Sequence, residues 1–311
     1  MTVAFANLFL ELYNTRKTKY AVDPNVCMRA VFATDLSDAI EAALSSRTCL
    51  ECLERYGIDE FDLITVTSPN VTAGMPGTIV GKQTKKGLAR QQRLLEREGF
   101  SVNTHVMRGT PHRRINGLAD RVDADLIIVG SRGQSPLEQR LIGGTARNMA
   151  RTTVRPLLLQ RIVEADDDHE VANEHLFERV LYATDFSENA ERAFDQFQHL
   201  STATQEATLV HVTPPERRSG SDEDTVEDAR ERLAELADRL ETKGIDTTVV
   251  VREGEAVEEI LSVEDEVDPT TILIGARGRS PMRRLLLGSV SEELIARADS
   301  NVLLVPPLRV R

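Results

Sequence analysis

Four residues near the C-terminus of the chain have the types and the spacing that a phosphate-binding loop needs. Gly275 and Gly278 are followed, after nine further residues, by Gly288 and Ser289. Glycines permit a tight turn and let backbone N–H groups approach a ligand closely, and the start of a following helix attracts anions. Ser289 and Glu292 fit a capping box, so we expect the serine hydroxyl either to cap that helix or to bind phosphate.

Positive charge surrounds this loop in a chain whose formal net charge is −12. The basic residues are Arg277, Arg279, Arg283 and Arg284. Arginine suits phosphate because its planar guanidinium can donate two parallel hydrogen bonds. The residues alone leave a second interpretation open, because glycines are common between strands and helices and arginines often form a solvated surface.

An internal repeat indicates which elements position this loop. Phe32–Ser37 recurs 150 residues later as Tyr182–Ser187, and Ile128–Pro136 recurs 145 residues later as Leu273–Pro281. In each copy short apolar runs alternate with longer amphipathic stretches, which predicts strands that alternate with helices and a parallel sheet covered on both faces. We therefore expect an α/β protein of two tandem, doubly wound, five-stranded domains.

The expected strands follow the same order in both halves. They are Arg29–Thr34, Asp62–Thr67, Ser101–Met107, Leu126–Val129 and Pro156–Gln160, then Arg179–Thr184, Ala207–Thr213, Asp246–Arg252, Thr271–Ile274 and Val302–Val305. Helices are expected over Glu188–Ala203 and Ser289–Ala298, with a shorter one over Thr145–Arg151. Ligands of such sheets bind beyond the carboxyl ends of the strands, where the strand order reverses.

The loop and the repeated blocks together resemble the nucleotide-binding branch of the universal stress protein family. The resemblance rests on Gly275-x2-Gly278-x9-Gly288-Ser289, on Thr184–Ser187, on Leu287–Leu294 and on Val302–Val305. It covers nearly all of both halves and implies a fold like that of the adenine nucleotide alpha hydrolases. It also implies an adenine nucleotide, ATP or AMP, with magnesium brought by the triphosphate rather than by a dedicated protein ligand.

The resemblance assigns roles to matching positions of the second half. Asp185 would lie by ribose and adenine with Ala183 and Thr184, and Val212 would offer its backbone to adenine. The phosphates would contact Gly275, Gly278, Gly288, Ser289 and Val290, and the positive charge of Arg277 places it in the same predicted site. A family-like pairing through the last strands, Pro156–Gln160 and Val302–Val305, can be satisfied within one chain, and a further homodimer remains open.

The first half departs from this pattern at one position. Gly130, Gly133 and Gly143 keep the glycine spacing, but Gly144 stands where serine or threonine is expected and Thr145 comes one position late. Thr34, Asp35 and Val66 match their counterparts. We expect a weaker second site built from Thr34, Asp35, Val66, Gly130, Gly133 and Gly143.

Composition and charge bound the remaining expectations. Residues 1–28 are expected to form an extension that includes an accessory helix at Val3–Leu12. The two domains are expected at residues 29–163 and 177–311, joined by a solvated acidic linker at residues 164–176. An acidic chain argues against general nucleic-acid binding, and without an apolar run of about 18 residues no membrane span is expected, so the cytoplasm is the default location. Cys49 and Cys52 form C-x-x-C within a helical pattern and are expected to be buried rather than redox-active or metal-binding.

Three functions remain open from the sequence. The first is a non-catalytic, nucleotide-responsive stress or signalling protein, the second a slow ATPase, and the third a ligand-free scaffold that uses the fold for pairing. We expect at most weak ATP hydrolysis, because Asp185 has no obvious acid–base partner and the six histidines lack metal-ligand spacing. His211 is expected to be a hydrogen-bonded residue at a strand end rather than a catalyst.

Overall fold

The first half of the chain forms five parallel strands with helices between them. In this computed structural model the described residues are 28–67, 77–131, 142–165, 168–171, 175–214, 226–278 and 287–308. The strands are β1 (Met28–Ala33), β2 (Ile58–Thr67), β3 (Ser101–Arg108), β4 (Leu126–Gly130) and β5 (Leu157–Gln160). The helices are α2 (Asp38–Ser45), α3 (Arg47–Tyr56), α4 (Gly77–Arg97), α5 (Pro111–Arg121) and α6 (Gly144–Thr152).

The second half repeats this order. Its strands are β8 (Arg179–Ala183), β9 (Glu206–Thr213), β10 (Asp246–Glu253), β11 (Thr271–Gly275) and β12 (Asn301–Val305). Its helices are α7 (Glu188–Phe194), α8 (Phe197–Leu200), α9 (Val226–Glu241), α10 (Ala256–Val267) and α11 (Ser289–Arg297). The prediction of two doubly wound α/β units is confirmed.

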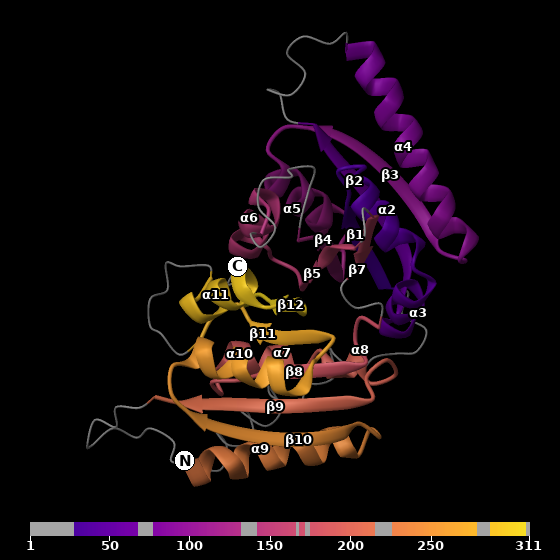
Figure 1. Cartoon of the computed structure of the whole chain (residues 1–311). Helices are drawn as coiled ribbons and strands as arrows, with labels where there is room; N and C mark the ends of the chain where they lie inside the picture. The colour runs from indigo at the N-terminus through magenta and orange to yellow at the C-terminus, as the bar shows by residue number, and fades with distance from the viewer. Residues whose placement is uncertain are drawn as a thin grey trace, which may run out of the picture.

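All ten strands join one sheet in the order β10-β9-β8-β11-β12-β5-β4-β1-β2-β3 (Figure 1). Within each half the pairing is parallel, whereas β12 and β5 pair antiparallel, with Leu303 opposite Leu158. This is the arrangement that the family resemblance implies for the last strands. We call the β5–β12 pairing the seam.

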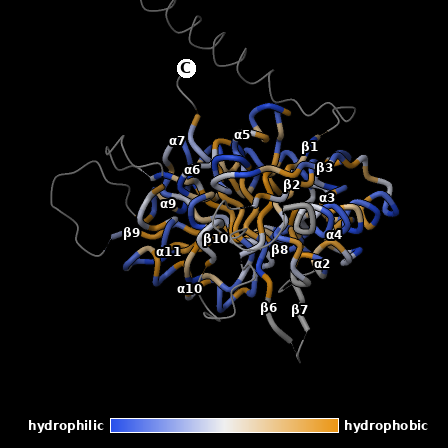
Figure 2. Tube along the Cα trace, turned by 90° about the horizontal axis from the view of Figure 1, so that it is seen from above, coloured by the Kyte–Doolittle hydropathy of each residue, from blue (hydrophilic) through white to orange (hydrophobic). Residues whose placement is uncertain are grey.

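Both faces of the sheet carry cores that run across the seam. One core contains Leu158 together with Leu303, and the other contains Leu159 together with Leu304. Figure 2 shows hydrophobic residues concentrated along the central strands and hydrophilic residues on the surrounding helices. The two strands of the seam are buried on both faces, which explains the apolar runs Leu157–Leu159 and Val302–Val305 within them.

The helices also connect the two halves beside the sheet. The Tyr56 hydroxyl at the end of α3 donates to Gln196 Oε1 at 2.7 Å, and its ring lies 5.5 Å from that of Phe177. Cys49 and Cys52 are buried on the same helix, as expected. Burial raises the pKa of the Cys52 thiol, so this environment does not favour a reactive thiolate.

Three local expectations were wrong. Part of the acidic segment expected as a solvated linker lies in an antiparallel hairpin, in which β6 (Ile162–Ala165) pairs with β7 (Asp168–Val171). The helix expected over residues 188–203 is interrupted by a turn between α7 and α8. Helices α6 and α11 each have nine residues, so the first is not shorter.

Other expectations fall on residues that the structure leaves undescribed. These are the accessory helix in the extension, Gly133, and the arginines at positions 279, 283 and 284. Among the helices that the structure does describe, none combines the length and apolar character needed to cross a bilayer.

Candidate functional site

The repeated Thr-Asp-x-Ser block forms the same turn at the end of β8 and of β1. In the second half, Thr184 Oγ1 accepts a hydrogen bond from the Phe186 amide at 2.9 Å, and Asp185 Oδ1 accepts one from the Ser187 amide at 3.0 Å. Phe186 has a φ of 58°, in the left-handed region, which turns the chain sharply toward α7. Asp185 is thereby held half-buried at the carboxyl end of the sheet.

The start of α7 is fixed by the same block. The Ser187 hydroxyl accepts from the Ala190 amide at 3.2 Å and caps the helix. Behind it, the Tyr182 hydroxyl donates to the Ala190 carbonyl at 2.7 Å, and burial raises the pKa of this tyrosine. Short local hydrogen bonds thus position Asp185 and the first turn of α7 together.

The loop after β11 is closed at its base by backbone hydrogen bonds. The Ala276 amide donates to the Val305 carbonyl at 2.8 Å, and the Gly288 amide donates to the Ala276 carbonyl at 2.7 Å. In the first half, Ser131 bonds Gln160 at 2.8 Å and Gly143 bonds Ser131 at 2.9 Å in the same way. Both copies therefore hold the ends of the predicted phosphate loop in the same geometry.

Close approach explains two of the loop glycines. A Cβ atom at Gly278 would lie 2.5 Å from Asp185 Oδ2, and one at Gly275 would lie 2.9 Å from the Asn189 carbonyl oxygen. The loop therefore passes directly beside the Asp185 carboxylate, at the switch point between the adjacent strands β8 and β11. Gly288 differs, because a Cβ there would lie 3.6 Å from its nearest neighbour, the Ala276 oxygen.

The expected capping box at the start of α11 is wrong. Gly288 occupies the N-cap position and Ser289 is the first helical residue, so Ser289 and Glu292 do not have the spacing from the cap that the motif requires. Ser291 instead donates its hydroxyl to the Gly275 carbonyl at 2.8 Å. Ser289 is exposed beside the N–H groups of the first turn, and Val290 is half-buried against the core.

Arg277 and Asn189 form a contact that the sequence analysis missed. The Arg277 amide donates to Asn189 Oδ1 at 2.8 Å, and Asn189 Nδ2 donates to the Val305 carbonyl at 3.0 Å. The Nε atom of Arg277 is buried, and within the described part of the chain it has no hydrogen-bond partner. The only available signal was the comparison of the two repeats, since Asn189 aligns with Ala39.

The expected adenine side of the site lies at the ends of β8 and β9. Ala183 and Thr184 are buried there, and Val212 is half-buried. His211 is buried, its Nδ1 lies 2.8 Å from the Thr184 carbonyl oxygen, and its ring centroid is 4.6 Å from that of Phe186. As expected, this histidine is a hydrogen-bonded residue of the strand end.

The first half places Thr34, Asp35, Val66, Gly130 and Gly143 at the equivalent ends of its strands and loop. There the Thr34 hydroxyl donates to Gln91 Oε1 at 2.8 Å inside the protein. Gly144 begins α6, as Ser289 begins α11, and a Cβ at Gly144 would meet nothing within 4 Å. The missing hydroxyl of the first half is therefore not a consequence of crowding.

Comparison with known proteins decides the family. The model of the universal stress protein family matches the chain twice, over residues 28–161 and 176–306. The chain belongs to the universal stress protein family. Universal stress protein MJ0577 of Methanocaldococcus jannaschii is 25% identical over 154 residues, which are 42% of this chain and 95% of that protein.

Longer relatives match both universal stress protein domains. A universal stress protein of Mycolicibacterium smegmatis is 25% identical over 221 residues, which are 69% of this chain and 72% of that protein. The crystal structure of a universal stress protein from Archaeoglobus fulgidus covers 89% of this chain and 97% of its own, with a TM-score of 0.68 and 23% identity. That likeness supports the tandem fold.

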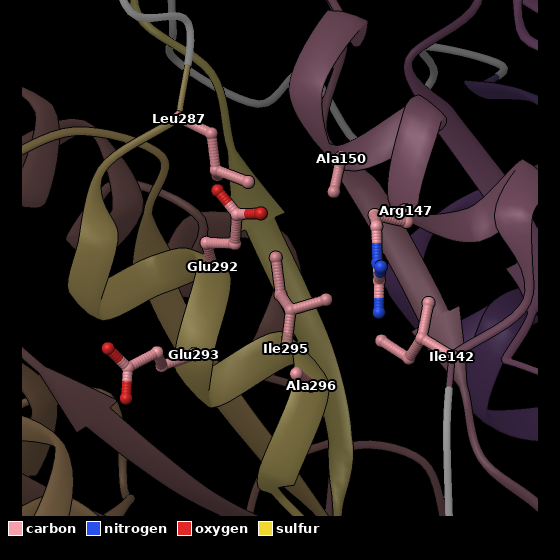
Figure 3. A pocket seen from close by; sticks show the side chains of 8 residues that line it. All are labelled: Ile142, Arg147, Ala150, Leu287, Glu292, Glu293, Ile295 and Ala296. Carbon is pink, nitrogen blue, oxygen red and sulfur yellow. The ribbon is translucent and has the colours of Figure 1, made fainter.

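A separate pocket lies between the two universal stress protein domains (Figure 3). It has a volume of about 300 Å³ and lies between α6 and α11. Its lining consists of Ile142, Arg147, Ala150, Leu287, Glu292, Glu293, Ile295 and Ala296. None of these residues was predicted to bind nucleotide, although Ile142 and Leu287 immediately precede the loop-closing glycines of the two domains.

Charges of opposite sign face each other near this pocket. Arg151 of α6 forms an ion pair with Glu292 of α11. Among the residues that the structure describes, no three His, Cys, Asp or Glu side chains gather as a metal site would require. The Asp185 carboxylate lies next to Gly278 of the second loop.

Proposed function

We propose that the chain is an adenine-nucleotide-binding universal stress protein whose main site lies in its second domain. The observation that carries the proposal is the approach of Gly278 to the Asp185 carboxylate at the carboxyl ends of the strands, where a Cβ atom would lie 2.5 Å from Asp185 Oδ2. Arg277 supports it, since its guanidinium adds positive charge to the loop directly before Gly278.

The residues fit a nucleotide in two parts. Asp185, with Ala183 and Thr184, would hold the ribose and adenine, and the Val212 backbone would contact the base. Gly275, Arg277, Gly278, Gly288, Ser289 and Val290 would hold the phosphates. The ligand is ATP or AMP, and a magnesium ion would come with the triphosphate.

The first domain would be a weaker site. It keeps Thr34, Asp35, Val66, Gly130, Gly133 and Gly143 but lacks the serine hydroxyl that α11 begins with. We keep the domain bounds of 29–163 and 177–311 and a cytoplasmic location as parts of the proposal. The role is a non-catalytic stress or signalling module whose state depends on bound nucleotide.

Extraction of the purified protein tests this proposal. We expect mass spectrometry of the acid-soluble fraction to find ATP or AMP in the unmodified chain and to find much less in Ser289→Ala with Gly278→Val. The proposal would be contradicted if the purified protein contained no adenine nucleotide and took up none on dialysis against millimolar ATP. Phosphate release above the level of the same double variant would instead favour the slow ATPase.

A ligand-free scaffold is the second candidate, because the seam joins both domains into one ten-stranded sheet. In this role the pairing itself would be the function. Static light scattering over a range of protein concentrations tests whether further copies associate. If the protein forms a homodimer and its molar mass is the same with and without ATP, the scaffold role would be favoured over a nucleotide-dependent role.

A further inference from the structure

Asn189 connects three segments of the second domain with one buried side chain. It lies in the first turn of α7 and is 7% exposed. Its Oδ1 accepts from the Arg277 amide at 2.8 Å, and its Nδ2 donates to the Val305 carbonyl at 3.0 Å. The side chain thus links α7, the first residues of the phosphate loop and the end of β12. We call these two hydrogen bonds the Asn189 bridge.

The bridge acts on the Ala276–Arg277 peptide, one residue before Gly278. Gly275 passes too close to the Asn189 backbone to accept a Cβ atom, and Gly278 lies directly against the Asp185 carboxylate, so the start of the loop has little room to shift. Fixing the Arg277 amide sets the direction in which the chain continues to Gly278 beside Asp185. Backbone donors bind phosphate well only when their orientation is set before the ligand arrives.

The first domain has no counterpart of this side chain. Its backbone repeats the loop closure of the second domain, with Ser131 bonded to Gln160 and Gly143 bonded to Ser131. The position that corresponds to Asn189 is Ala39, a residue type without an amide group. The two loops share their glycines and their backbone closure and differ in this bridging residue.

We propose that Asn189 is a positioning residue that orients the phosphate loop of the second domain and so makes this domain the stronger nucleotide site. This inference rests on the proposed function. It assigns the difference between the domains to a buried amide in addition to the serine hydroxyl. Because Val305 belongs to the strand that forms the seam, the bridge also ties the loop to the strand that pairs with the first domain.

Calorimetry with two ligands tests the inference on the full chain. Asn189→Leu removes both hydrogen bonds and keeps a side chain of similar shape, and Asn189→Ala is a second variant. We expect an about tenfold weaker affinity for ATP, in line with the loss of one or two buried hydrogen bonds. Affinity for adenosine, which has no phosphate, should change by less than about twofold on the same reasoning.

Asn116→Leu is the matched control, because Asn116 also donates its amide to a backbone carbonyl, that of Thr152, but lies in α5 of the first domain. It should leave both affinities unchanged. Equal losses of ATP and adenosine affinity in Asn189→Leu would overturn the inference, because a general structural defect would explain them. An unchanged ATP affinity would overturn it as well.

A ligand-free measurement separates this inference from the proposed function. Amide hydrogen exchange of Arg277, followed by NMR, should become about tenfold faster in Asn189→Leu and stay unchanged in Asn116→Leu. If the unmodified chain binds neither ATP nor adenosine, the proposed function fails. If amide exchange of Arg277 is the same in Asn189→Leu as in the unmodified chain, the positioning role of Asn189 fails.

Discussion

Arg161 provides the sharpest stability prediction because it joins the two domains at the end of the seam. It follows β5 in the first domain and is 9% exposed. Its guanidinium donates to the Ile295 carbonyl at 2.6 Å and to the Ser300 carbonyl at 3.1 Å, both in the second domain. Its backbone amide donates to Asn301 Oδ1 at 2.8 Å.

Arg161→Met tests the weight of these contacts. Methionine keeps most of the apolar stem but leaves two carbonyls without the guanidinium donor. Each buried acceptor that loses its donor costs about 1–3 kcal/mol, so we expect the free energy of unfolding to fall by about 3 kcal/mol. The Ile295 carbonyl lies in the last turn of α11, where a cation is also favoured by the helix dipole.

Arg155→Met is the matched control on the same side of the seam. Arg155 pairs with Asp123 at 2.5 Å, but the Asp123 side chain is 86% exposed. Exposed ion pairs contribute about 0–1 kcal/mol, so this variant should change little.

Urea unfolding followed by circular dichroism is the assay. With an m-value of about 3 kcal/mol/M, the loss of about 3 kcal/mol would lower the midpoint by about 1 M in Arg161→Met. Equal midpoints for Arg161→Met and Arg155→Met would refute the reasoning, because a buried arginine would then contribute no more than one whose ion-pair partner is exposed.

Two further predictions concern the loop and the contact between α3 and α8. Gly275→Ala should lower the free energy of unfolding by about 1–3 kcal/mol, because its Cβ would lie 2.9 Å from backbone atoms of Asn189. Gly288→Ala should lower it by less than about 1 kcal/mol. Thermal unfolding compares the two variants, and similar losses would count against the close approach. Burial, and then the charge of Lys243, lower the pKa of His199 below its ordinary value of 6.5. The His199 imidazole therefore binds a proton less readily in the folded chain than in the unfolded chain. The favourable burial of neutral His199 contributes fully to stability above pH 6.5, and this contribution is lost as the pH falls below 6.5. His199→Phe keeps a ring against Tyr56 and should flatten this fall when urea midpoints are compared at about pH 7.5 and pH 5, while an unchanged slope would contradict the assignment.

The repeated blocks were sufficient to predict the ten strands of the main sheet, their order along the chain and the doubly wound class, because apolar runs and turn residues are local signals. The positions of Asp185, Gly275 and Gly278 also followed, since strand ends of one sheet meet at one edge. Asn189 and Arg161 did not follow. Arg161 donates to backbone carbonyl groups distant in sequence, and Asn189 bonds a distant backbone amide and a distant carbonyl. Nothing in their local sequence indicates these partners.

The errors have similar causes. Ser289 matched a capping box, but the backbone bond from Gly288 to Ala276 sets the N-cap one residue earlier. The acidic segment after β5 suggested a solvated linker by composition, yet Ile162 and Val171 pair in a hairpin. Composition describes how well a segment is solvated and does not exclude local strand pairing.

Titration calorimetry with ATP on three proteins tests the central claim most directly. The three proteins are the unmodified chain, Gly278→Val and Gly133→Val. The two variants place the same side chain in the loop of the second domain and of the first domain, respectively. We predict one dominant site per chain, which Gly278→Val abolishes and Gly133→Val leaves intact. Absence of binding in the unmodified chain, or loss of the dominant site in Gly133→Val alone, would contradict a main nucleotide site beside Asp185.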